Sequence, residues 1–313
     1  MSGRPGSVAD AGSSACVADQ PVIDEHCRGI PAGPLRRYVA RYMGYRQRGV
    51  PPARHRGLPS PYLTLIFTLD EPLTIAAHPD PGQPPGEFGA LLGGLHSAPA
   101  LITHEGAQSG IQVALRPLGA RALLGLPAGE LASLDVPAEA VLGGVCAELR
   151  DRVLAAASWP ERFAILDEIL SRRATADTGV ATADADVAPE VGWAWRRLLR
   201  SGGDVRVSAL ADETGWSGRH LTSRFRAEIG LTPKAAARVI RFDRARTLLV
   251  SSADAGYRLA DLAADCGYFD QAHLAREFRT LAGCPPSQWL AEEFRNVQAG
   301  NWLDGETWED RAW

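Results

Sequence analysis

Residues 262–286 read LAADCGYFDQAHLAREFRTLAGCPP, and they repeat a pattern that occurs earlier, at residues 210–233, as LADETGWSGRHLTSRFRAEIGLTP. The offset between the copies is 52 residues at the start (262 against 210) and 53 at the end (286 against 233). One residue, Phe269, has been added in the later copy. An internal repeat decides the architecture of its region, and two short copies are too few for a solenoid. The sequence therefore predicts a small unit that occurs twice.

Each copy has the features of a helix-turn-helix. It begins with Leu-Ala, and a glycine follows four residues after that alanine, Gly215 in one copy and Gly267 in the other. Glycine here allows the positive φ of a tight turn between two helices. Ser217 or Asp270 comes next as a candidate N-cap, because its side-chain oxygen can accept from the first N–H groups of the following helix.

The second helix of each copy has a narrow apolar stripe. Counted from the N-cap, the stripe falls at positions +4 and +8: Leu221 and Phe225 in one copy, Leu274 and Phe278 in the other. This spacing keeps one face on the core and leaves the rest of the helix free to enter a DNA groove. A glycine ends each helix, and a proline starts the next one.

Residues 206–290 resemble the DNA-binding domain of the AraC/XylS family of bacterial transcription regulators. The positions of the second copy that match the family signature are Leu262, Ala263, Gly267, Tyr268, His273, Leu274, Arg276, Phe278, Arg279, Gly283 and Pro286. The resemblance implies two helix-turn-helix units in one chain, each placing its second helix in the major groove of double-stranded DNA. The region before it is similar, less specifically, to the β-rich sensor-like domains attached to some members.

The helix positions facing away from the stripe are the candidates for DNA contact. The resemblance places base reading on Arg219, Thr222 and Ser223 in the first copy, and on Gln271, Ala275 and Arg276 in the second. Arginine pairs bidentately with guanine, glutamine with adenine, and a small side chain fits against a thymine methyl group. We expect Arg226 and Arg279 to bind phosphates.

Two pairs of residues qualify this assignment. His220 and His273 hold matched positions beside the stripe, where we expect structural hydrogen bonds and not base contacts. Ser223 stands where many members carry a longer polar or basic residue, and Ala272 offers no hydrogen bond. The base preference therefore cannot be copied from relatives.

A long helix is predicted between the two copies, over residues 233–249. Its apolar positions are Val239, Ile240, Phe242, Ala245, Leu248 and Leu249. A rigid connector holds the two recognition helices about one DNA turn, near 34 Å, apart. One chain can then read two successive major grooves.

The 313 residues divide by composition. We predict a disordered start at residues 1–20, a β-rich sensor or dimerisation domain at 21–173, a linker at 174–190, the double helix-turn-helix domain at 191–295 and a Trp-rich acidic tail at 296–313. The linker residues are mainly Ala, Thr, Asp and Val. The fold class is therefore α+β, with a β-rich part followed by an all-α part.

The N-terminal domain shows short strands separated by turn residues. Strands are predicted at residues 62–69, 73–77, 88–95, 99–104 and 111–115, with a Pro-rich loop at 78–87. This density of short strands indicates a small barrel or sandwich. Helices are predicted at 117–126, 137–157 and 159–173. The resemblance implies that helices after the sensing domain form a dimer contact.

Tyr38, Tyr42 and Tyr45 are spaced by four and three residues, which would place all three rings on one helical face. A strand beginning near Tyr45 fits the same residues equally well. Core packing is the expected role in either case.

The net charge of −4 is distributed unevenly. Residues 191–295 hold 16 Lys and Arg against 12 Asp and Glu, a net of +4, so the remainder carries −8. A mildly basic module joined to an acidic one fits DNA binding through one part only.

Several classes of site are absent from the sequence. The five cysteines show no C-x-x-C spacing, which fits a reducing cytosol without a disulfide or zinc framework. His78, His96 and His104 are too loosely spaced for a metal site. No apolar run of about 18 residues and no signal peptide occur. We therefore predict a cytoplasmic protein with no cofactor, metal or membrane span.

Three functions remain open. The first is a regulator controlled by a small-molecule effector at the N-terminal domain. The second is a constitutive DNA-binding regulator whose N-terminal domain dimerises or contacts a protein partner such as RNA polymerase. An enzyme with a DNA-directed module would need a nucleophilic cysteine or a metal cluster, and neither is found. The effector-binding residues are unknown; candidates for lining a pocket are Arg54, Arg56, Tyr62, His96 and Arg116.

Overall fold

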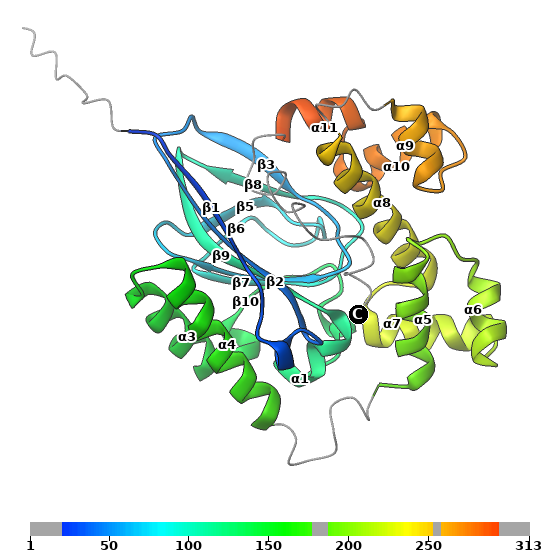
Figure 1. The fold of residues 1–313 in the computed structure, drawn as a ribbon, viewed down its shortest axis with the longest axis horizontal. Coiled ribbons are helices and arrows are strands. Elements are labelled where there is room, and N and C mark those ends of the chain that lie inside the picture. Colours follow the sequence, from blue (N-terminus) through cyan, green and yellow to red (C-terminus); the bar gives the residue numbers. More distant parts are fainter. Residues whose placement is uncertain (1–20, 177–186, 253–257, 294–313) are drawn as a thin grey trace, which may run out of the picture.

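The computed structural model describes residues 21–176, 187–252 and 258–293 (Figure 1). Residues 21–176 form a sandwich region and the described residues from 187 to 293 form a helical region. Figure 1 shows the sandwich region in blue to green, with the helical region in yellow to orange beside it. The α+β class is confirmed, with the strands in the first region and an all-helical second region.

The strands of the sandwich region form two antiparallel sheets. The strands are β1 (Ile23–Gly29), β2 (Val39–Arg48), β3 (Ala53–Gly57), β4 (Leu63–Thr68), β5 (Leu73–Ala77), β6 (Gly86–Phe88), β7 (Ala90–Gly93), β8 (Ala100–His104), β9 (Ala107–Leu115) and β10 (Asp135–Pro137). One sheet has six strands in the order β1-β2-β9-β4-β7-β10, and the other has four in the order β3-β8-β5-β6. The two sheets do not close into a barrel, so the sandwich alternative is the right one.

The alternation of β4 explains how the layers stack. Leu63, Leu65 and Phe67 belong to one core together with the helices, while Ile66 belongs to a second core between the sheets. Successive side chains of a strand point to opposite faces, so β4 is buried on both. The six-stranded sheet is therefore the middle layer, between the four-stranded sheet and the helices.

The helices of the sandwich region cover one face of the six-stranded sheet. The short helices are η1 (Gly33–Leu35), η2 (Pro117–Gly119), α1 (Ala120–Leu124), η3 (Ala128–Leu131) and α2 (Glu139–Leu142), and the longer ones are α3 (Gly144–Ala155) and α4 (Trp159–Ala176). The single helix predicted at 137–157 is wrong. Gly143 interrupts it with φ 57° and ψ −137°, a backbone conformation outside the helical range.

The tyrosines of the N-terminal region pack in the core, as predicted, but not on a helix. Tyr42 and Tyr45 lie in β2, and Tyr38 immediately precedes that strand. All three side chains are buried. The helical alternative for these residues is wrong because β2 is buried on both faces, which removes the simple alternation that marks a strand.

The helical region contains the two predicted units. Its helices are α5 (Pro189–Arg200), α6 (Val207–Thr214), α7 (Gly218–Ile229), α8 (Pro233–Ser251), α9 (Leu259–Asp265), α10 (Gln271–Ala282) and α11 (Pro286–Glu293). The pairs α6–α7 and α9–α10 are the two copies, and α8 is the predicted connector. Pro233 opens α8, and the hydroxyl of Thr232 accepts from the N–H of Ala235 at 3.2 Å. Phe225, Phe242, Phe278 and Trp289 lie in one buried core.

The predicted N-terminal segment 1–20, the tail 296–313 and most of the linker 174–190 lie outside the described residues. Helix α4 reaches Ala176 and α5 begins at Pro189. Among the described residues, no helix combines the length and the apolar character that crossing a membrane requires.

Candidate DNA interface

The first helix-turn-helix unit has the local geometry that its sequence predicts. Gly215 ends α6 with φ +70°, in the left-handed region that glycine tolerates best. The side chain of Ser217 accepts from the N–H of His220 at 3.2 Å and caps α7. Leu221 and Phe225 are fully buried on the inner face of α7. The turn thus sends α7 outward with its opposite face away from the core.

The second unit repeats this geometry. Gly267 has φ +72°, and the carboxylate of Asp270 accepts from the N–H of His273 at 2.6 Å. Leu274 and Phe278 are fully buried on the inner face of α10. Two helices with the same turn, cap and apolar stripe therefore present matched outer faces.

The predicted DNA-contact residues lie on these outer faces. The exposed ones are Arg219, Ser223, Arg226, Gln271, Arg276 and Arg279, and the half-buried ones are Thr222 and Ala275. The hydroxyl of Thr222 donates to the Gly218 carbonyl at 2.7 Å. This bond holds the hydroxyl on the helix and leaves the Thr222 methyl group for apolar contact.

The two matched histidines support the turns. The ring of His273 accepts from the N–H of Phe269 through Nδ1 at 3.3 Å and packs edge-on against Tyr268. His220 packs edge-on against Trp216, with ring centroids 4.5 Å apart. The structural role expected for His273 is confirmed by its hydrogen bond, and the ring of His220 packs within its own turn.

An ion pair fixes the second recognition helix on the connector. Arg238 of α8 donates two hydrogen bonds to the carboxylate of Glu277 on α10, at 2.8 and 2.9 Å. The hydrogen bonds to Glu277 raise the pKa of Arg238 above its ordinary value. A bidentate pair restricts the geometry more than a single contact does, so α10 is held at a set orientation.

Phe269 is a candidate that the assignment of base-reading residues omits. It is 92% exposed and directly precedes the cap of α10. The first unit has no corresponding residue, because Phe269 is the one addition that breaks the repeat. The change of offset from 52 to 53 was the signal in the sequence that could have identified it.

The outer face of α7 lies opposite the sandwich region. A groove of about 660 Å³ separates them. Its α7 wall carries Arg219, Thr222, Ser223 and Arg226, and its facing wall carries Gly129 and Ala132. All four predicted contacts of the first unit therefore line one groove.

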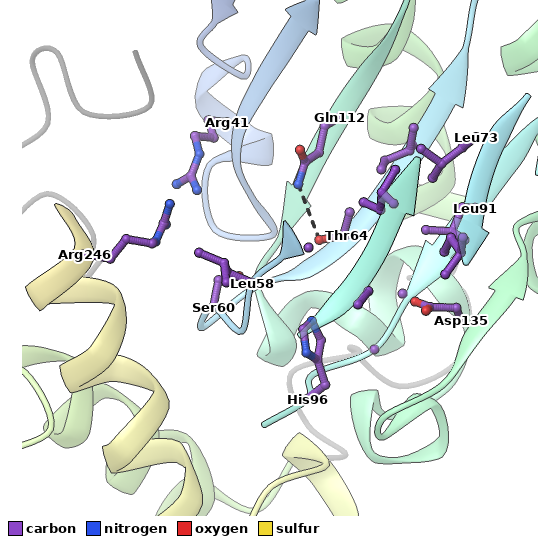
Figure 2. Close-up of a pocket in the computed structure, with 17 residues that line it drawn as sticks. Arg41, Leu58, Ser60, Thr64, Leu73, Leu91, His96, Gln112, Asp135 and Arg246 are labelled. Carbon is purple, nitrogen blue, oxygen red and sulfur yellow. Dashed lines mark hydrogen bonds between the residues drawn. The ribbon is translucent and has the colours of Figure 1, made fainter. Parts of the chain in front are cut away.

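A small cavity of about 70 Å³ lies between the two sheets and reaches the helical region. Its inner wall is apolar, with Ile66, Leu73, Ile75, Leu91 and Ile102 among the lining residues. At its other end Arg41 of β2 and Arg246 of α8 point toward each other (Figure 2). The cavity thus combines an apolar interior with two guanidinium groups from different regions.

Further polar groups around this cavity are already engaged. Asp135, which lines it, lies 2.7 Å from Nδ1 of buried His78. His96 contacts the Ala98 carbonyl through Nδ1, and burial lowers its pKa below the ordinary value. Gln112 donates to Thr64 at 3.5 Å, the dashed line in Figure 2.

The five pocket candidates of the sequence do not come together. His96 lines the cavity, and Tyr62 lies beneath the guanidinium of Arg41, with 4.9 Å to its ring centroid. Arg56 instead pairs with Glu292 of α11, and Arg116 donates to the Arg36 carbonyl. Arg54 is exposed on β3. Arg41 and Arg246 were missed because neither stands in a motif. In the described residues no three His, Cys, Asp or Glu side chains converge as metal ligands.

Two family profiles match the chain. The profile described as "Helix-turn-helix domain" matches residues 210–292, and a "Domain of unknown function (DUF6597)" matches residues 28–137. A curated relative is the "Uncharacterized HTH-type transcriptional regulator YbfI" of Bacillus subtilis, 35% identical over 71 residues. That match covers 23% of this chain and 24% of the relative, so the chain spans about a quarter of the relative's length.

Solved structures show weaker likenesses. ToxT from Vibrio cholerae has a TM-score of 0.48 at 13% identity, covering 80% of this chain and 97% of ToxT. A structure of the same protein, titled as bound to unsaturated fatty acid, has a TM-score of 0.45 at 9% identity, covering 87% and 95%. The C-terminal domain of AraT, a response regulator from Geobacillus stearothermophilus, has a TM-score of 0.31 at 23% identity, covering 33% and 85%.

Proposed function

Since residues 210–292 are a helix-turn-helix domain of the AraC type, we propose that this chain is a sequence-specific transcription regulator that reads two successive major grooves. One observation carries the proposal. Two capped helices, α7 and α10, expose the same positions of a repeated pattern while burying the same Leu and Phe. The second helix of such a unit lies in the major groove with its N-terminal residues at base edges.

The residues on the two helices have different roles in this proposal. Base edges are read by Arg219, Thr222, Ser223, Gln271, Ala275 and Arg276, and phosphates are bound by Arg226 and Arg279. Base contacts carry sequence information, whereas phosphate contacts set position and orientation. Substitutions on α10 should therefore separate the two effects.

Replacing Arg276 with Ala should remove preference at one base pair, because a bidentate Arg–guanine pair contributes about 1–3 kcal/mol of discrimination. Replacing Arg279 with Ala should weaken binding to all sequences alike and lower the salt slope by about one unit. The measurement is a set of binding titrations, at several salt concentrations, on a duplex selected from a random pool and on its single-base variants.

Each variant serves as the control for the other, since both remove one exposed arginine from the same helix. If Arg276→Ala lost affinity equally for every sequence, Arg276 would not be a base reader. If Arg279→Ala changed the preferred base, its assignment to phosphate would be wrong.

The sandwich region is proposed to bind a small-molecule effector in the cavity between the sheets. Arg41 and Arg246 are both buried and bring two positive charges together at the boundary of the two regions. An anion between them would offset their repulsion, which is strong where solvent is excluded. The apolar wall accepts the body of the ligand, and a volume of about 70 Å³ limits it to a small one. A small acid with an apolar body fits this combination.

Thermal shifts of the full chain test this effector class. Benzoate and hexanoate should raise the melting temperature, because a ligand at 100 times its Kd stabilises the native state by about 2.7 kcal/mol. Benzamide and hexanamide, which lack the charge, should not. Arg41→Met should abolish the shift, while Arg37→Met should keep it, since Arg37 also lies over a tyrosine ring but does not line the cavity. Equal shifts with acids and amides would contradict an anion site.

The remaining features follow from a role on DNA. RNA polymerase and a second copy of the chain are the proposed protein partners, and the cytoplasm, where bacterial DNA lies, is the proposed location. No enzymatic activity is proposed. The alternative is a constitutive regulator whose sandwich region only dimerises or contacts a protein; in that case no small molecule would shift the melting temperature.

A further inference from the structure

Helix α7 is docked on the sandwich region through a charged contact. Arg121 of α1 donates two hydrogen bonds to the carboxylate of Glu228 on α7, at 2.9 and 2.8 Å. The side chain of Glu228 is only 10% exposed, so the pair is shielded from solvent on that side. Leu95 and Leu118 of the sandwich region add apolar contact with the core of the helical region. The two regions thus meet through a specific interface.

The closest part of this interface is backbone against backbone. A Cβ atom at Gly129 of η3 would lie 2.0 Å from the Ala227 carbonyl oxygen and 2.9 Å from that of Arg226. Across the contact, a Cβ at Gly230 would lie 3.3 Å from the Ala128 carbonyl. Only a residue without a side chain permits this approach at Gly129. The end of α7 therefore rests directly on η3.

This docking restricts the outer face of α7. A recognition helix needs a major groove about 12 Å wide around it, with a phosphate backbone passing on each side. Here one side is occupied by Gly129 and Ala132, across a groove of about 660 Å³ that Arg219 and Thr222 also line. That space cannot hold a DNA duplex. Insertion of α7 into DNA and its contact with η3 exclude each other.

The other recognition helix is not restricted in this way. Helix α10 packs on α8, α9 and α11, and within the described residues no element of the sandwich region packs on it to a similar extent. Gln271, Arg276 and Arg279 are exposed on its outer face. The two units are alike in sequence but differ in access.

We propose that the sandwich region masks the first recognition helix, so that the chain in this arrangement binds DNA through α10 alone. This inference rests on the proposed DNA-binding function. Release of η3 from α7 exposes the second reading surface and extends the bound site from one turn of duplex to two. The contact that holds the mask consists of η3 and the Arg121–Glu228 pair.

Gly129→Ala is the most direct test, because the three atoms nearest to the added methyl group all belong to α7. Gly129 does not have a positive φ, so alanine causes no backbone strain within the sandwich region itself. Gly144→Ala is the matched control, since its Cβ would meet no atom within 4 Å. The assay is hydroxyl-radical footprinting of each full-length protein on a duplex selected from a random pool by Gly129→Ala.

Wild type and Gly144→Ala should protect about one turn, and Gly129→Ala should protect two. Binding should tighten by about 5- to 150-fold, the usual range for coupling between two sites. Arg121→Glu should have the same effect by placing two carboxylates together. Adding Glu228→Arg to it restores an opposite-charge pair and should return the footprint to one turn.

The outcomes separate the mask from the proposed function. If wild type already protects two turns with the affinity of Gly129→Ala, the mask is overturned while DNA reading by both units stands. If all folded variants protect one turn, including Arg121→Glu, the mask is also overturned. If no folded variant protects any duplex, the proposed function fails, and the inference fails with it.

Discussion

Replacing Phe278 with Ala is expected to lower the free energy of unfolding by about 3–5 kcal/mol, the usual cost of truncating a buried phenylalanine. The ring is fully buried between the connector and the last described helix. It meets Phe242 of α8 edge-on, with centroids 4.9 Å apart, and Trp289 of α11 at 6.2 Å. Phe225→Ala should have a cost in the same range, since that ring is equally buried and packs on Trp195 at 6.1 Å.

Urea denaturation followed by tryptophan fluorescence measures both effects. Phe269→Ala is the matched control, because it removes the same side chain from a position that is 92% exposed. Its unfolding free energy should change by less than about 0.5 kcal/mol, as for most surface substitutions. Near-wild-type stability of Phe278→Ala would mean that the stripe of the recognition helix does not hold the unit together.

The helical region could be predicted closely because its signals are local. Ser217 and Asp270 cap the helices that follow them, and Gly215 and Gly267 take the positive φ expected of the turn. Each of these choices depends on a few neighbouring residues, and the repeat states each of them twice. The outward direction of the DNA-contact residues then follows from the buried Leu and Phe.

The sandwich region was predicted less completely because its elements depend on distant partners. Strand β10 has three residues, ends in Pro137 and exists only because it pairs with β7. β1 was not predicted; its partner is β2, which contains Tyr42 and Tyr45. Apolar periodicity continued across Gly143, so two helices read as one. Tertiary pairing overrides local pattern in such segments.

The interface between the regions had no signal in the sequence. Gly129 stands in an ordinary Pro-Ala-Gly loop, and its need for a missing side chain comes from α7, about 100 residues further along the chain. Arg41 and Arg246 likewise belong to different regions and meet only when the chain has folded. The fold of each unit could be predicted from its own residues, whereas the access to its DNA-reading face could not.

The central claim is that α7 and α10 read two successive major grooves, and the isolated helical region tests it without the sandwich region in place. A fragment of residues 187–293 retains Val187 and Trp289, which both belong to its core. Circular dichroism verifies that it is helical, and hydroxyl-radical footprinting on a duplex selected by the fragment measures the site. The expected result is two protected stretches about one turn, or 10–10.5 base pairs, apart. A single protected stretch from the folded fragment, unchanged by Arg219→Ala, would contradict the claim.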